Sequence, residues 1–174
     1  MALRKILTEP NKILREKSLK VESVDKDLQN LMDDMLETMY AAPGIGLAAI
    51  QVGIPKRIIV LDISYKEGKK NPMYFVNPEI IEKSNKNSTY EEGCLSVPGQ
   101  FAEIDRPDQC HIKYLDYFGQ HKEMKAEGML ATCIQHEMDH LEGILFIDYL
   151  SKLKKSMIVK KLSKQKKALE RIVV

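Results

Sequence analysis

The sequence predicts an α+β fold, with mostly antiparallel strands around a central helix and a further helix at the C-terminus. Segments in which apolar and polar residues alternate indicate strands, whereas apolar residues spaced by three and four indicate helices. The chain has 174 residues, of which 44% are hydrophobic and 30% charged, as is typical of a globular domain. No repeat or linker interrupts residues 1–150, which we expect to form one domain, with residues 151–174 as a basic helix packed on it or extending from it.

The first helix is expected at residues 25–41, where one face is apolar. Asp25 is a suitable N-cap because its carboxylate can accept a hydrogen bond from a free backbone N–H. Pro43 and Gly44 would end the helix. The apolar face follows the helical spacing and consists of Leu28, Leu31, Met32, Met35, Leu36 and Met39.

Four strands are expected, at residues 57–61, 73–76, 110–117 and 122–126. The last two form a hairpin that turns near Gly119. A second helix is expected at residues 129–141, ended by Gly143, and from about Asp148 the chain is expected to be helical again. This last helix carries a partial apolar stripe of Leu150, Leu153, Met157, Leu162 and Leu169.

Charge is unevenly distributed along the chain, whose formal net charge is +2. Residues 151–174 contain nine Lys or Arg and one acid, so this segment carries +8 and the remainder carries −6. Two interpretations of the basic segment stay open. It either binds a partner through its charge, or it is a solvated lysine face on a helix that packs on the body.

The N-terminal residues and the number of cysteines indicate the cellular compartment of the protein. Residues 1–7 lack the apolar core of a signal peptide, and Glu9, Glu16 and Glu22 argue against an acid-poor transit peptide. No run approaches 18 uncharged apolar residues. Three cysteines cannot all pair, which favours a reducing compartment. We therefore expect a cytoplasmic protein with no membrane contact, or one that is already trimmed.

The most informative motif is Gln-His-Glu-Met-Asp-His at residues 135–140. Residues four apart lie on one helix face, so His136 and His140 can bind one metal ion. Glu137 would lie beside that ion, where a general base for a bound water is needed. The alternative is a helix that carries two surface histidines. Because the chain has only four histidines, this spacing with an adjacent Glu favours a hydrolytic metal site.

A third metal ligand is needed, because catalytic sites usually have three protein ligands and one open position. No His or Cys follows His140, and no acid after it has the spacing of a zincin third ligand. Cys94, in the segment Glu-Gly-Cys-Leu-Ser, is the best upstream donor. Cys110 and Cys133 fit the alternative of a buried free cysteine better.

The segment at residues 44–53 is small and apolar and contains Gly44 and Gly46. It is not a phosphate loop, because the Gly-x-x-x-x-Gly-Lys pattern is absent. The glycines indicate either a close approach of another group to the backbone or a turn inside the core.

Three motifs, in this order, resemble the peptide deformylase family. Residues 44–51 match Gly-φ-Gly-φ-Ala-Ala-x-Gln, residues 92–96 match Glu-Gly-Cys-Leu-Ser, and residues 135–141 match Gln-His-Glu-x-Asp-His-Leu. The resemblance extends from residue 1 to the helix after Ser151 and is greatest to the bacterial type I branch, which ends in a C-terminal helix. It implies an enzyme that removes the N-formyl group from the formyl-methionine of newly synthesised polypeptides.

The resemblance implies a role for each residue of the metal site. Cys94, His136 and His140 would bind one divalent ion, natively Fe²⁺, for which Zn²⁺, Ni²⁺ or Co²⁺ can substitute. One Cys and two His suit several divalent ions, so the geometry of the site and the availability of each metal decide which ion is bound. Glu137 would take a proton from the attacking water and pass it to the departing amine.

The resemblance also implies groups that bind the substrate. The side-chain amide of Gln51 and the backbone N–H of Leu95 would donate to the tetrahedral oxyanion. The formyl-methionyl peptide would lie along residues 44–46, with its side chain in an apolar pocket. The expected substrate-binding residues are Gly44, Ile45, Gly46, Met129 and Cys133. Core packing is the competing interpretation for Ile45, Met129 and Cys133.

A supporting contact is expected behind the Cys94 loop. In the family, the Glu of Glu-Gly-Cys pairs with an arginine at the separation of Arg106. We therefore expect a Glu92–Arg106 ion pair rather than two solvated charges. Ile50 and Thr132 differ from the residues of many relatives. We expect them to change the shape of the pocket edge and to leave the metal ligands unaffected.

The implied partners are N-formylmethionyl nascent peptides and, under one interpretation of the basic helix, the ribosome near its exit tunnel. A monomer is expected. Two other functions stay open: a zincin-type metallopeptidase and a non-catalytic metal-binding accessory of the ribosome. The upstream cysteine argues against the first, and Glu137 argues against the second, because a structural site needs no general base.

Overall fold

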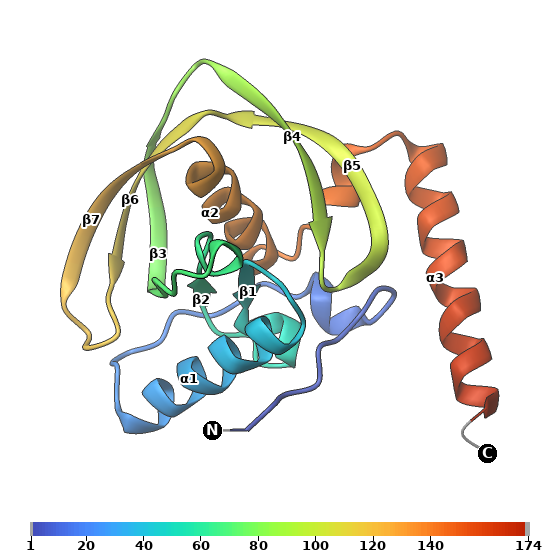
Figure 1. The fold of residues 1–174 in the computed structure, drawn as a ribbon, viewed down its shortest axis with the longest axis horizontal. Helices are drawn as coiled ribbons and strands as arrows, with labels where there is room; N and C mark the ends of the chain where they lie inside the picture. Colours follow the sequence, from blue (N-terminus) through green and yellow to red (C-terminus); the bar gives the residue numbers. More distant parts are fainter. Residues whose placement is uncertain (1, 173–174) are drawn as a thin grey trace.

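A computed structural model describes residues 2–172 and confirms the α+β class (Figure 1). The α-helices of this part of the chain are α1 (Lys26–Ala41), α2 (Gly128–Leu141) and α3 (Lys152–Ile172). Short 3-10 turns are η1 (Lys12–Arg15), η2 (Ala49–Val52), η3 (Tyr65–Glu67) and η4 (Phe146–Tyr149). The strands are β1 (Gly46–Ala48), β2 (Ile58–Leu61), β3 (Met73–Lys83), β4 (Asn87–Cys94), β5 (Val97–Pro107), β6 (Gln109–Leu115) and β7 (His121–Glu127).

The main sheet is antiparallel, with its strands in the order β1-β2-β3-β6-β7. Because side chains alternate along a strand, β2 contributes to two clusters of buried residues. Ile59 and Leu61 pack with α2, whereas Ile58 and Val60 pack with α1. The sheet therefore separates the two helices, and α2 lies in the middle of the molecule (Figure 1).

The second sheet is the hairpin of β4 and β5, which curves over α2 (Figure 1). A third cluster of buried residues joins this hairpin to η4 and α3 through Val97, Ile104, Phe146 and Leu162. The hairpin and α2 thus face one another. These are the two elements that carry the Cys-containing motif and the His-containing motif.

The expected first helix is confirmed. Helix α1 begins at Lys26, and the side chain of Asp25 accepts a hydrogen bond from the backbone N–H of Leu28 at 2.8 Å. Five of the six residues of the expected apolar face are buried, and Leu36 is partly buried. The face packs on the sheet, which supplies most of its stabilisation because isolated helices of this length are marginal.

Two expected strands have other limits in the structure. The strand expected at 73–76 continues to Lys83, because a bulge with Asn77 at φ 50° lets Ile80 pair with Ile112. Asn-Pro resembles a turn in sequence, so the continuation was not predicted. The strand expected at 110–117 ends at Leu115, where the Asp116 carboxylate accepts from Phe118 and Gln120 N–H groups and forms the turn.

The hairpin of β4 and β5 was not predicted at all. Its first strand, Asn-Ser-Thr-Tyr-Glu-Glu-Gly-Cys, is mostly polar, so no alternation of apolar residues marks it. Cys94 is the last residue of β4, and Leu95 and Ser96 connect it to β5. Pairing with β5, rather than burial of an apolar face, therefore defines this strand.

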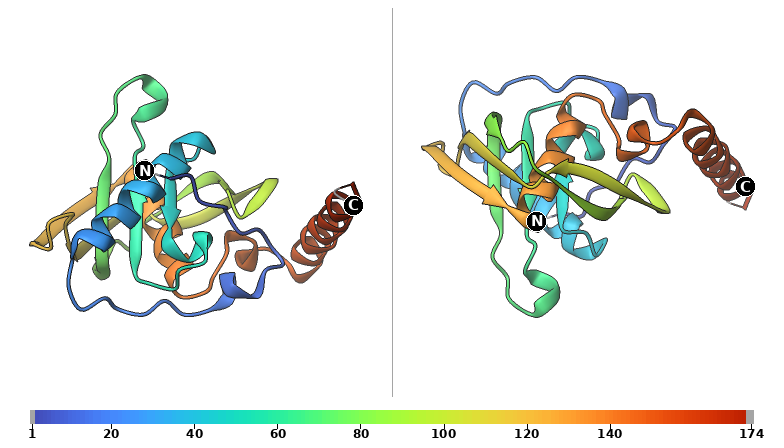
Figure 2. Two further views of the ribbon diagram at one scale, coloured as in Figure 1. Left: turned by 90° about the horizontal axis from the view of Figure 1, so that it is seen from below. Right: turned by 90° about the horizontal axis from the view of Figure 1, so that it is seen from above.

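The C-terminal helix begins later than expected. Residues 146–149 form η4, Leu150 is extended, and α3 starts at Lys152. Only Leu162 of the expected apolar stripe is buried, at 4% exposure, whereas Leu153, Met157 and Leu169 are exposed. Helix α3 lies at one side of the molecule, as both views of Figure 2 show.

Within residues 2–172, no helix has both the length and the apolar character needed to cross a membrane.

Candidate functional site

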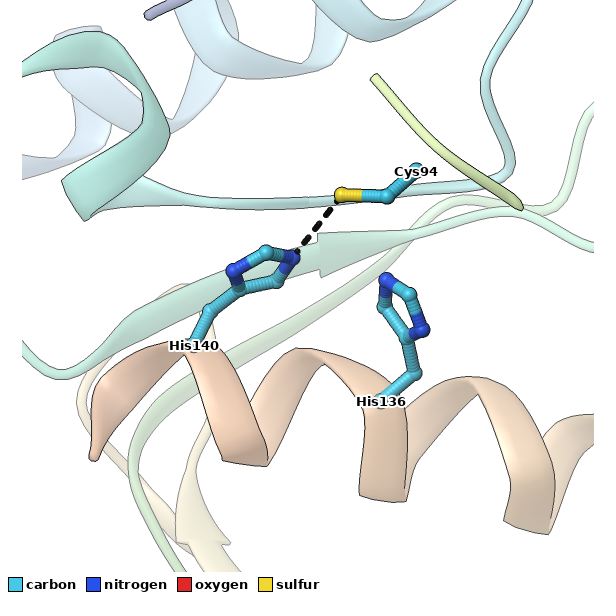
Figure 3. Close-up of side chains that lie close together, drawn as sticks. All are labelled: Cys94, His136 and His140. Carbon is cyan, nitrogen blue, oxygen red and sulfur yellow. Dashed lines mark hydrogen bonds between the residues drawn. The ribbon is translucent and has the colours of Figure 1, made fainter. Parts of the chain in front are cut away.

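Three side chains from two elements meet beside α2. His136 and His140 lie one turn apart on this helix, and Cys94 approaches from the end of β4. The Cys94 Sγ atom is 3.2 Å from His140 Nε2, and one donor atom from each residue lies within 4.8 Å of the others (Figure 3). Both histidines are buried. The two motifs therefore converge on one point.

This arrangement fits a divalent metal ion. Ligands about 2.0–2.3 Å from one ion lie roughly 3.5 Å apart in a tetrahedral site, which is close to the 3.2 Å between Cys94 Sγ and His140 Nε2. Burial lowers the pKa of His140 well below its ordinary value, which favours the neutral ring that binds a metal. Thiolate and imidazole donors together suit several first-row metals.

The ring of His136 is oriented by Glu92. A Glu92 oxygen lies 2.8 Å from His136 Nδ1, so Nε2 is left for another partner. Burial lowers the pKa of His136, but the neighbouring Cys94 and Glu92 outweigh burial and hold this pKa well above its ordinary value. Arg106 donates to both oxygens of Glu92, at 2.5 and 3.0 Å. The expected Glu92–Arg106 pair is thus confirmed.

Glu137 is a buried carboxylate next to the histidines. Burial raises its pKa to about 7, and its Oε2 has no hydrogen-bond partner among the residues that the structure describes. A Cβ atom at Gly46 would lie 2.5 Å from Glu137 Oε1 and 2.7 Å from a Leu61 methyl carbon. Only glycine at position 46 therefore leaves the carboxylate in place, and the close-approach interpretation of this glycine is confirmed.

The side-chain amide of Gln51 is held at both ends. Its Oε1 accepts a hydrogen bond from the Ala48 N–H at 2.8 Å, and its Nε2 donates to Ser96 Oγ at 3.0 Å. The same Nε2 is 3.6 Å from Cys94 Sγ. The Gln51 Nε2 amide group consequently lies between Ser96 and the cysteine. Ser96 was not predicted to take part, although it lies within the Glu-Gly-Cys-Leu-Ser motif.

A cavity of about 470 Å³ opens beside these groups. All the residues expected to act on or bind a substrate line it: Gly44, Ile45, Gly46, Gln51, Leu95, Met129, Cys133 and Glu137. Cys94 and His136 also reach the cavity, whereas His140 is fully buried behind it. Phe101 lines the cavity too and was missed, because the strand that carries it was not predicted.

The three cysteines are free thiols with different surroundings. Cys110 and Cys133 are buried, as expected for structural cysteines, and burial raises the pKa of the Cys133 thiol to about 12. Cys94 is partly exposed to the cavity. Cys94 is therefore the cysteine placed to act as a ligand.

Comparison with known proteins identifies the family. The model of the family described as polypeptide deformylase matches residues 3–156. The chain belongs to this family. The peptide deformylase of Pelagibacter ubique is 68% identical over 174 residues, which cover all of both chains. That of Maricaulis maris is 60% identical over 98% of each chain.

Solved structures of peptide deformylases have the same fold. The enzyme from Ehrlichia chaffeensis in complex with actinonin has a TM-score of 0.90 and 45% identity, over 95% of this chain and 98% of that one. The enzyme from Legionella pneumophila has a TM-score of 0.89 and 46% identity, over 98% and 99%.

Peptide deformylases are metal-dependent hydrolases that remove the N-formyl group from newly synthesised polypeptides. The chain is an enzyme with this activity and acts on formylated nascent peptides. The function implied by the three motifs is confirmed. A zincin-type peptidase and a non-catalytic accessory are no longer needed as alternatives.

Proposed function

We propose that Cys94, His136 and His140 hold one divalent ion, and that deformylation takes place in the adjoining cavity. The observation that carries this proposal is the convergence of three donor atoms within 4.8 Å beside a buried carboxylate. When bound, such an ion supplies Lewis acidity and lowers the pKa of a water molecule that it holds. We propose Fe²⁺ as the native ion, from the family resemblance, with Zn²⁺, Ni²⁺ or Co²⁺ able to replace it.

Glu137 is proposed as the general base and then the general acid. Its pKa of about 7 suits a group that must both accept and release a proton near neutral pH. Its carboxylate takes a proton from the attacking water as the water oxygen adds to the formyl carbon. The protonated carboxyl then gives this proton to the amine nitrogen of methionine as the bond between that nitrogen and the formyl carbon breaks. The free amine departs, and the formic acid that remains loses its own proton and leaves as formate.

Gln51 and the backbone N–H of Leu95 are proposed to bind the oxyanion of the tetrahedral intermediate. The Gln51 amide is already oriented by Ala48 and Ser96, so little reorganisation is required when charge develops. A donor that is in place before the reaction stabilises the transition state more than the substrate.

The cavity wall is proposed to bind the formyl-methionyl end of the peptide. Gly44, Ile45 and Gly46 line the cavity, so an extended peptide can lie along the backbone of residues 44–46. Ile45, Met129 and Cys133 are apolar or weakly polar and line the cavity, which suits a methionine side chain.

The experiment that tests this proposal compares two cysteine variants. Cys94→Ala removes a proposed ligand, whereas Cys110→Ala removes a buried thiol from the core between the sheet and α2. We expect Cys94→Ala to lose bound metal and formyl-Met-Ala-Ser hydrolysis, and Cys110→Ala to keep both. Metal analysis after anaerobic purification and a deformylase assay measure this. Full metal content and activity in Cys94→Ala would overturn the proposed ligand set.

We further propose that residues 1–150 form the catalytic domain and that residues 151–174 extend from it as a ribosome-docking helix. Eight lysines of α3 provide the positive charge, and most of them are exposed. The exposed Leu153, Met157 and Leu169 favour docking over a helix that merely packs on the body. A monomer that works in the cytoplasm, where nascent chains emerge, fits this arrangement.

A further inference from the structure

Two residues beyond the metal ligands contact the Glu92–Arg106 pair, and none of the roles given above accounts for them. Arg106 uses Nη1 to donate to Asp139 Oδ2 at 2.8 Å. The hydroxyl of Tyr149 donates to the same oxygen at 2.7 Å. The guanidinium of Arg106 also lies 5.0 Å from the centre of the Tyr149 ring. Asp139 and Tyr149 therefore extend the hydrogen-bond network that begins at His136.

Asp139 gives the network a second attachment to α2. The first attachment is the contact between Glu92 of β4 and His136. The second is the contact between Arg106 of β5 and Asp139, which lies one residue before His140. The hairpin carries Cys94, and α2 carries both histidines. The two attachments therefore restrain the distance between the cysteine of the hairpin and the histidines of α2.

Tyr149 covers the side of this network that faces solvent. Arg106 is buried, but the Asp139 side chain is 19% exposed and Tyr149 is 52% exposed. The ring of Tyr149 lies over the guanidinium while its hydroxyl holds the carboxylate, so one side chain restrains both partners of the ion pair. Shielding from water strengthens an ion pair, and a cation over an aromatic ring adds attraction.

We propose that Tyr149 is a positioning residue of the metal centre: with Asp139 it holds Arg106 against Glu92, and thereby holds the cysteine-bearing hairpin on the histidine-bearing helix. The proposal rests on the proposed metal ligands. Tyr149 does not line the cavity and is not one of the proposed ligands, so its effect reaches the ligands through Asp139, Arg106 and Glu92. The expected signature is therefore faster loss of metal, with little change in the chemical step of the loaded enzyme.

The test compares two tyrosine-to-phenylalanine variants. Tyr149→Phe removes only the hydroxyl that donates to Asp139. Tyr117→Phe is the matched control, because its hydroxyl donates to Asp33 at 2.9 Å between the β6–β7 turn and α1. Metal dissociation is followed in the holoenzyme with a chromogenic chelator in excess. A residue that contacts a ligand directly changes metal affinity about 10–100-fold when it is replaced. Tyr149 reaches His136 only through Arg106 and Glu92, so we expect a smaller effect, with dissociation about threefold to tenfold faster.

Tyr117→Phe is expected to release metal at the wild-type rate, and kcat of metal-saturated Tyr149→Phe is expected to stay within about twofold of wild type. Tyr149→Leu removes the ring as well and should accelerate release further. Release from Tyr149→Phe at the wild-type rate, or equal acceleration in both phenylalanine variants, would overturn the inference. Retention of metal by Cys94→Ala would instead refute the proposed ligands, so the two failures are distinguishable.

Discussion

The metal-site region and helix α3 differ in how tightly their side chains are restrained. Around α2, Glu92, Arg106 and Asp139 each contact two or more charged or polar partners, and the first two are buried. Helix α3 instead packs on the body through a few apolar residues, among them Leu162, and most of its surface is exposed.

The difference follows from what each region has to do. Metal binding and proton transfer depend on atom positions, and errors of about 1 Å are costly, so several contacts restrain each group. A helix that contacts phosphates needs charge density rather than fixed geometry. Substitutions around α2 are consequently expected to change chemistry or metal retention, whereas substitutions on α3 are expected to change association.

Apart from Glu137, the largest effect on kcat is expected at Gln51. Gln51→Ala removes a donor that is held ready by Ala48 and Ser96, and loss of one oxyanion donor lowers kcat about a hundredfold or more. Steady-state kinetics on formyl-Met-Ala-Ser measure the loss, and metal content should stay at the wild-type level. An unchanged kcat would remove Gln51 from the mechanism.

A smaller effect, on metal retention, is expected at Glu92. Glu92→Gln keeps the shape of the side chain but removes the charge that pairs with Arg106 and orients His136, so metal affinity should fall about 10–100-fold. Competition with a chelator measures this affinity. Glu103→Gln, an exposed position on the same hairpin, is the matched control and should bind metal as wild type does. Equal affinity in the two variants would show that Glu92 does not support the ligand.

The smallest effect on catalysis is expected on α3. Replacement of Lys160, Lys161, Lys164 and Lys167 by Gln leaves Leu162 packed, so deformylation of a free peptide should be unchanged. Co-sedimentation with ribosomes should weaken, and its salt dependence should become shallower, because fewer phosphates are contacted. Co-sedimentation equal to wild type at every salt concentration would exclude docking through these lysines.

Sequence reasoning predicted the parts of the fold in which local patterns carry information. The 3.6-residue periodicity and the Asp25 cap define α1, and the spacing of His136 and His140 requires a helix at α2. The β4–β5 hairpin escaped prediction, because its strands pair with each other and bury few apolar side chains. No local pattern places Cys94 beside the histidines, so it was identified as a ligand from the need for a third donor and then from the family resemblance.

The site shows the same limit. Candidate ligands and donors were found from motifs. The Glu92–Arg106 pair was predicted because family members have an arginine at the same distance along the sequence from this Glu. The contact of Tyr149 with Asp139 joins two segments whose side chains are brought together only by the end of α2 and the turn η4. Ser96 and Phe101 were likewise missed, because their roles depend on where β5 begins and which way it faces.

The central claim is that Glu137 moves the proton while the three ligands hold the ion. Glu137→Gln keeps the size and burial of the side chain but cannot accept the proton, so kcat for formyl-Met-Ala-Ser should fall about 10²–10⁴-fold, the range of general acid–base catalysis. One metal ion per chain should remain bound. A Glu137→Gln variant that holds its metal and turns over at the wild-type rate would contradict the claim.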